Sequence, residues 1–91
     1  MRLLLVEDDP MIGESVLDVL RAEHYAVDWV KNAGSADTAL RTETYDLVLL
    51  DLGLPDGDGL SVLRELRARK ARIPVIIATA RDAIDQRIAG L

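Results

Sequence analysis

Two apolar runs that end in carboxylates place the strongest constraint on how this chain can fold. Residues 3–6, Leu-Leu-Leu-Val, run directly into the acidic residues 7–9. Residues 47–50, Leu-Val-Leu-Leu, run into Asp51 in the same way. Near-continuous apolar strands are typical of parallel sheets that are covered on both faces, and such open sheets bind ligands at the carboxyl ends of their strands. The two runs therefore predict one acidic site at one edge of a buried parallel sheet.

Strand-like and helix-like segments alternate along the rest of the chain. Strands are predicted over residues 2–6, 25–30, 46–50 and 74–78. Helices are predicted from Asp9-Pro10 onward, over residues 33–41, around Leu60, Val62, Leu63 and Leu66, and around Ile84, Ile88 and Leu91. Alternation with short loops favours right-handed crossovers. We therefore expect an α/β, flavodoxin-like doubly wound parallel sheet in the order 2-1-3-4, which places the first and third strands side by side.

The first helix has clear start signals and an apolar stripe. Asp9 can cap it, and Pro10 suits its first position. Apolar residues at helical spacing are expected to form its inner face: Ile12, Val16, Val19 and Leu20. Trp29, on the second predicted strand, is expected to serve packing.

Length, charge and composition limit the classes of function. The chain has 91 residues, which predicts one domain, and a formal net charge of −5, which argues against direct binding of nucleic acid or an anionic membrane. The first apolar run is too short for a signal peptide or a membrane span. There is no cysteine, so disulfides and thiolate chemistry are excluded, and we expect a cytoplasmic location.

The clustered acids point to cation and phosphoryl chemistry. Glu7, Asp8 and Asp51 would repel one another at one sheet edge unless a cation or a reaction requires them. Mg²⁺ prefers oxygen ligands and often uses one or two carboxylates plus a phosphate, and a carboxylate can itself become an aspartyl phosphate. Thr79 follows the fourth strand and offers a hydroxyl to a phosphoryl oxygen. The alternative is ordinary: solvated loop acids, a capping Asp9 and a turn threonine.

These segments resemble the receiver domain of bacterial two-component response regulators. The matching pieces are residues 4–9 (LLVEDD), 46–59 (DLVLLDLGLPDGDG) and 74–81 (PVIIATAR), and the resemblance covers the whole chain in register. The sequences of the loop at residues 53–59 and of residues 78–82 are most similar to those of regulators that carry a C-terminal winged-helix DNA-binding domain, the OmpR/PhoB class.

The resemblance implies a role for each matching residue. Asp51 would be the phosphoacceptor, and Asp8 and Glu7 would hold Mg²⁺ together with Asp51 and the backbone carbonyl of Gly53. Thr79 would be the switch hydroxyl that moves toward the phosphoryl group. The phosphodonor would be a phosphohistidine on a sensor histidine kinase, and the domain would be a phosphoacceptor rather than an enzyme.

The family pattern continues past Leu91 through a fifth strand that bears a lysine, an aromatic switch residue and a fifth helix. We therefore expect residues 1–91 to be an incomplete receiver domain, truncated before that strand and without its DNA-binding domain. Contact with DNA is expected only through that absent domain. The alternative is a non-phosphorylated dimerisation scaffold, a homodimer that exchanges its C-terminal segment between two chains.

Two other acidic patterns fit less well. Asp56, Asp58, Gly59 and Glu65 follow part of the EF-hand spacing, but Leu54 stands where the first calcium ligand belongs. A haloacid-dehalogenase-type phosphatase needs a second aspartate two residues after Asp51, where this chain has Gly53.

Overall fold

A computed structural model describes residues 1–51, 54, 59–69 and 72–77. The strands of one parallel sheet are β1 (Arg2–Val6), β2 (Ala26–Val30), β3 (Leu47–Leu50) and β4 (Val75–Ile77), in the order β2-β1-β3-β4. The helices are α1 (Pro10–Ala22), α2 (Ala33–Thr42) and α3 (Gly59–Ala68). The predicted doubly wound order 2-1-3-4 is confirmed, and the helix predicted around Ile84 lies outside the described residues.

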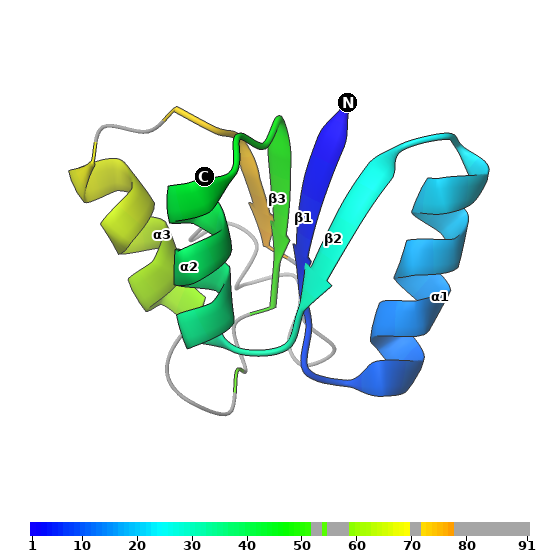
Figure 1. Ribbon diagram of the computed structural model, residues 1–91. Helices are drawn as coiled ribbons and strands as arrows, with labels where there is room; N and C mark the ends of the chain where they lie inside the picture. Colours follow the sequence, from blue (N-terminus) through cyan, green and yellow to red (C-terminus); the bar gives the residue numbers. More distant parts are fainter. Residues whose placement is uncertain (52–53, 55–58, 70–71, 78–91) are drawn as a thin grey trace.

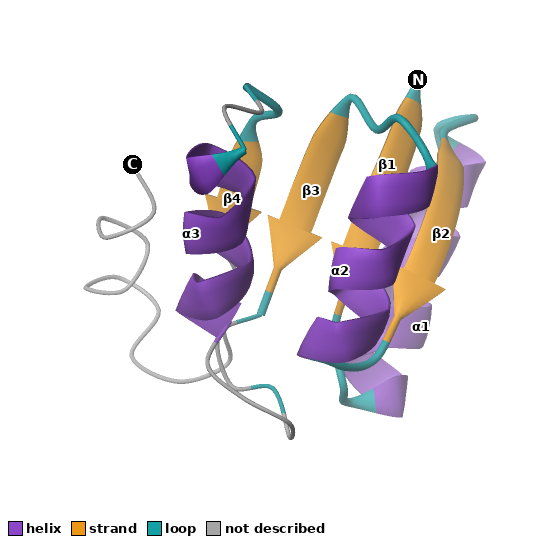
Figure 2. Ribbon diagram, turned by 60° about the vertical axis from the view of Figure 1, so that its left-hand side comes forward, coloured by secondary structure: helices purple, strands orange, loops and turns teal. Residues whose placement is uncertain are grey.

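Helices cover the two faces of the sheet in separate layers. Figures 1 and 2 show α1 on one face, beside β1 and β2, and α2 with α3 on the other face. All four strands run in the same direction, so their carboxyl ends gather at the lower edge of the sheet in Figure 1. None of the described helices combines the length and apolar character that crossing a membrane requires.

β1 is buried on both faces, as its uninterrupted apolar sequence predicts. Side chains alternate along a strand. Leu3 and Leu5 accordingly belong to the cluster under α1, and Leu4 and Val6 to the larger cluster under α2 and α3. Burial on both faces fixes the position of β1 at the centre of the sheet.

The inner face of α1 differs from the prediction. Asp9 caps the helix as expected, since its carboxylate accepts hydrogen bonds from the backbone N–H groups of Met11 and Ile12. The residues that pack on the sheet, however, are Val16, Leu17 and Leu20. Two members of the predicted stripe are exposed: Ile12 by 36% and Val19 by 64%. The prediction was wrong at Val19. Ile12 still lines a hollow with Leu5 and Leu49 of the sheet, and Gly13 is the buried residue of α1.

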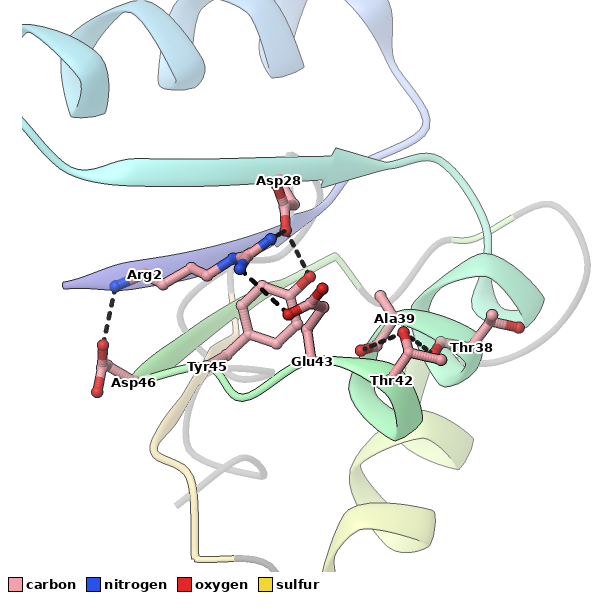
Figure 3. A network of polar contacts seen from close by, with 8 residues as sticks. All are labelled: Arg2, Asp28, Thr38, Ala39, Thr42, Glu43, Tyr45 and Asp46. Carbon is pink, nitrogen blue, oxygen red and sulfur yellow. Dashed lines mark hydrogen bonds and ion pairs between the residues drawn. The ribbon is translucent and has the colours of Figure 1, made fainter.

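A polar network ties the strands together at their amino ends (Figure 3). The Arg2 guanidinium donates hydrogen bonds to Asp28, at 2.8 Å, and to Glu43, at 3.2 Å, while its backbone N–H donates to Asp46 at 2.8 Å. The Tyr45 hydroxyl donates to the same Asp28 oxygen at 2.6 Å. The network therefore joins β1 to β2 and to the segment that leads into β3.

Charge and burial shift the pKa values of two groups in this network. The hydrogen bond from Tyr45, followed by that from Arg2, lowers the pKa of the Asp28 carboxyl. Burial, with the Asp28 carboxylate beside it, raises the pKa of Tyr45 to about 12. Asp28 is thus held as a carboxylate and Tyr45 as a neutral donor across the neutral pH range.

Replacing Tyr45 by Phe removes the donor to Asp28 and keeps the buried ring. We expect the free energy of unfolding to fall by about 1 kcal/mol at neutral pH, because a hydrogen bond to a charged acceptor is lost. Urea denaturation measures the loss. The variant should show its full loss of stability at pH values above 3.8, the ordinary pKa of Asp. The loss should become smaller as the pH falls through the lower pKa of Asp28 in the folded protein.

Tyr25→Phe is the matched control, because Tyr25 is 37% exposed. That variant should unfold like the wild type. An equal loss of stability in both variants, or a loss in Tyr45→Phe that does not change with pH, would contradict the role given to the network.

Candidate functional site

The parallel register of β1 and β3 brings two acids together. Val6 pairs with Leu50, so Glu7 and Asp51 each follow a paired position at the same edge of the sheet. The Asp51 backbone N–H also donates to the Val6 carbonyl oxygen at 3.0 Å. Backbone pairing, rather than attraction between the side chains, therefore places the two carboxylates side by side.

Asp8 completes the cluster. One carboxylate oxygen from each of Glu7, Asp8 and Asp51 lies within 4.8 Å of the others. Glu7 and Asp51 are buried, at 7% and 8% exposure, whereas Asp8 is half-buried. The cluster is therefore open to solvent through Asp8 and closed around the other two acids.

Burial makes the charge on Glu7 costly. Desolvation, with the neighbouring Asp51 and Asp8 carboxylates adding to it, raises the pKa of Glu7 to about 7, against a hydrogen bond from the Asp9 backbone N–H that lowers it. Protonated Glu7 donates a hydrogen bond to Asp51. A cation bound here would take the place of that proton and relieve the same repulsion.

The backbone of Glu7 is held by β2. Its N–H donates to the Val30 carbonyl at 3.0 Å, and its carbonyl accepts from the Trp29 indole N–H at 2.8 Å. The sequence predicted only packing for Trp29. A half-buried indole usually finds an acceptor for its N–H, which was the available signal, but the sequence did not show that the acceptor is the backbone of a site residue.

Two predicted site residues, Gly53 and Thr79, lie outside the described residues, as do Asp56 and Asp58 of the partial EF-hand pattern. The remaining acid of that pattern, Glu65, lies on α3 and accepts a hydrogen bond from Arg41 at 3.1 Å. An ion pair between helices therefore accounts for the Glu65 carboxylate.

The three carboxylates form a donor set that fits a hard divalent cation. Mg²⁺ takes oxygen ligands, uses few carboxylates and keeps several waters. A half-buried Asp8 leaves room for such waters, and burial together with the neighbouring carboxylates raises the pKa of Glu7, which a bound cation would oppose. Asp51 adds a carboxylate that can act as a nucleophile at the same point.

The sequence of the chain is similar to those of known proteins. Residues 3–91 match the family model of the response regulator receiver domain. The chain is 45% identical to response regulator protein PmrA of Pseudomonas aeruginosa and 47% identical to transcriptional regulatory protein PmrA of Pectobacterium parmentieri. Each match covers 100% of this chain and 41% of the relative, so the chain spans less than half the length of these curated relatives.

A solved structure agrees with the fold. The response regulator TrrA of Thermotoga maritima, in complex with Mg²⁺ and BeF, superimposes with a TM-score of 0.84 at 36% identity. That match covers 89% of this chain and 70% of TrrA. With a family model matched over residues 3–91 and the same parallel sheet, the chain belongs to the response regulator receiver domain family.

Proposed function

We propose that this chain is the phosphoacceptor domain of a two-component signalling pathway, in which Asp51 receives a phosphoryl group from a sensor histidine kinase. One observation carries the proposal: the buried Asp51 carboxylate lies at the carboxyl end of β3, within 4.8 Å of carboxylate oxygens of Glu7 and Asp8. A nucleophile and the ligands for a charge-neutralising cation thus occupy one place.

The reaction is a transfer between two side chains. An Asp51 carboxylate oxygen attacks phosphorus, the bond from phosphorus to the kinase imidazole nitrogen breaks, and an acyl phosphate forms. Mg²⁺, when bound, stabilises the charge on the phosphoryl oxygens. Glu7 and Asp8 hold that ion together with Asp51, and we assign a further ligand to the Gly53 carbonyl and the switch hydroxyl to Thr79 from the family resemblance.

The product is the phosphorylated domain itself, which carries the signal. Phosphorylation adds negative charge to an already acidic edge, and such a change shifts the balance between two arrangements of a domain. We propose that this domain is not an enzyme for other substrates and acts in the cytoplasm. Its readout is transcription, through a DNA-binding output domain.

One observation favours the second candidate, a dimerisation scaffold. Ile76 of β4 is 50% exposed, although its neighbours Val75 and Ile77 are buried. Val19 is 64% exposed on α1, the helix on the face of the sheet opposite α2 and α3. A second copy of the chain could cover these apolar side chains, with or without exchange of the C-terminal segment.

The phosphoacceptor proposal predicts that Asp51→Asn abolishes phosphorylation, because the amide replaces the nucleophilic carboxylate without changing its size. The chain is incubated with Mg²⁺ and an acyl phosphate donor, quenched in acid, and analysed by intact mass. The wild type should gain one phosphoryl group, and omission of Mg²⁺ should prevent the gain.

Asp46→Asn is the matched control, because Asp46 precedes β3 as Asp51 follows it. That variant should be phosphorylated like the wild type. Phosphorylation of folded Asp51→Asn would show that another residue is the acceptor, and an unmodified wild type would argue for the scaffold.

Repulsion within the cluster predicts that Glu7→Gln stabilises the metal-free protein at high pH. The wild type loses stability as the pH rises from the ordinary value of 4.5 toward about 7, because the folded state holds a proton that the unfolded state releases. The variant lacks this loss, since the Gln amide donates to Asp51 as protonated Glu7 does. The gain should grow with pH and reach at most a few kcal/mol above pH 7.

Thermal unfolding with a chelator, at pH 4.5 and above pH 7, measures this difference. Glu14→Gln, which neutralises an exposed acid of α1 and keeps Glu7, is the control, and its stability should change with pH as that of the wild type does. Added Mg²⁺ should stabilise the wild type more than Glu7→Gln. A Glu7→Gln variant that is less stable than the wild type at every pH would contradict the repulsion.

The scaffold hypothesis predicts a stable dimer whose formation does not depend on Mg²⁺ or phosphodonors. Sedimentation equilibrium should then show association that Ile76→Asp abolishes, because a charge cannot be buried in an apolar contact without cost. Asp37→Asn, on the opposite face of the sheet, is the control and should associate normally. A monomer at all concentrations would rule the scaffold out.

A further inference from the structure

Trp29 contacts the acidic site from a neighbouring strand. Its indole N–H donates to the Glu7 carbonyl oxygen at 2.8 Å, and the next residue, Val30, accepts from the Glu7 N–H at 3.0 Å. Trp29 itself pairs with Leu5 in the register of β1 and β2. Both backbone polar groups of Glu7 are therefore held by consecutive residues of β2, past the last residue of β1.

Gly13 provides the space that the Trp29 ring occupies. A Cβ atom at Gly13 would lie 2.1 Å from Cζ2 of Trp29 and 2.5 and 2.8 Å from two further ring atoms. A rigid ring cannot give way locally as the end of a flexible side chain can. Gly13 also donates its backbone N–H to the Asp9 carbonyl at 2.8 Å, which closes the first turn of α1. The ring therefore packs against the turn that follows the acidic residues.

A lysine lies against the same ring. The Lys31 ammonium is 4.9 Å from the centroid of the Trp29 ring, within the range of a cation–π interaction. The ring is thus fixed by the indole hydrogen bond, by the close contact with α1 and by a cation. Packing alone would need only the apolar part of this set, and a phenylalanine would supply it.

We propose that Trp29 is a positioning residue for the acidic site, with Gly13 as the surface on which it packs. Through the Glu7 carbonyl and the first turn of α1, Trp29 holds residues 7–9 at both ends and so aims the Glu7 and Asp8 carboxylates at Asp51. This inference rests on the proposed function of the cluster as a Mg²⁺ site. It goes beyond that function, because Trp29 touches neither the ion nor the phosphoryl group.

The first test is Mg²⁺ affinity of Trp29→Phe, measured by isothermal titration calorimetry with the metal alone. The variant keeps an aromatic ring and loses the indole donor. We expect the dissociation constant to rise about 10-fold, since residues that orient metal ligands affect affinity on this scale. The matched control is Tyr45→Phe. This change also removes a hydrogen-bond donor of an aromatic side chain, the hydroxyl that donates to Asp28 of β2, but at the opposite edge of the sheet. Its Mg²⁺ affinity should equal that of the wild type.

The second test is an NMR titration of the indole N–H signal, which is unambiguous because the chain has one tryptophan. The signal should shift with Mg²⁺ in the wild type, with the dissociation constant found by calorimetry, and should not shift in Asp8→Asn. Gly13→Ala keeps the tryptophan but displaces its ring, so the metal-free signal should move and the Mg²⁺ affinity should fall as in Trp29→Phe.

The outcomes separate the two proposals. A wild type that binds no Mg²⁺ would overturn the metal site and the positioning role together. The positioning role alone would be overturned by equal Mg²⁺ affinity in the wild type and folded Trp29→Phe. It would also be overturned by an indole signal that does not shift when Mg²⁺ is added. Equal weakening in Trp29→Phe and Tyr45→Phe would show a general loss of stability and would also overturn it.

Discussion

The parallel pairing of β1 with β3 is the constraint on which the site depends. Because Val6 lies opposite Leu50, the next residue on each strand is an acid at the same edge. The strands cannot slide apart to relieve the repulsion, since a shift of one residue would turn their buried side chains to the opposite faces. Leu4 and Val48, neighbours in this register, are completely buried. Burial of the core thus holds together charges that would otherwise separate.

The two edges of the sheet place their buried or half-buried carboxyl groups in opposite electrostatic surroundings. At the amino ends, Arg2 and Tyr45 surround Asp28 with donors, which favours its charged form. At the carboxyl ends, burial of Glu7 beside two more carboxylates raises its pKa to about 7. The first edge contributes stability and the second costs stability in the absence of a cation. Unfavourable local electrostatics of this kind are characteristic of functional sites.

β2 supports the site although none of its side chains belongs to the acidic cluster. It binds both backbone groups of Glu7, and its tryptophan packs on Gly13 of α1. The close approach at Gly13 also explains the orientation of the helix. With Gly13 against the ring, Val16, Leu17 and Leu20 face the sheet, and Val19 is left exposed. One contact therefore links the packing of α1 to the geometry of the acidic residues.

Much of this arrangement was determined by the sequence alone. The apolar strands, their alternation with helices, the order 2-1-3-4 and the meeting of Glu7, Asp8 and Asp51 follow from local patterns and from general rules of parallel sheets. Only the tertiary structure decided which side of α1 is buried, what the Trp29 indole binds and how far burial raises the pKa of Glu7. These features depend on distances between residues far apart in the chain, and a side chain's surroundings, rather than its type, set its packing and its charge.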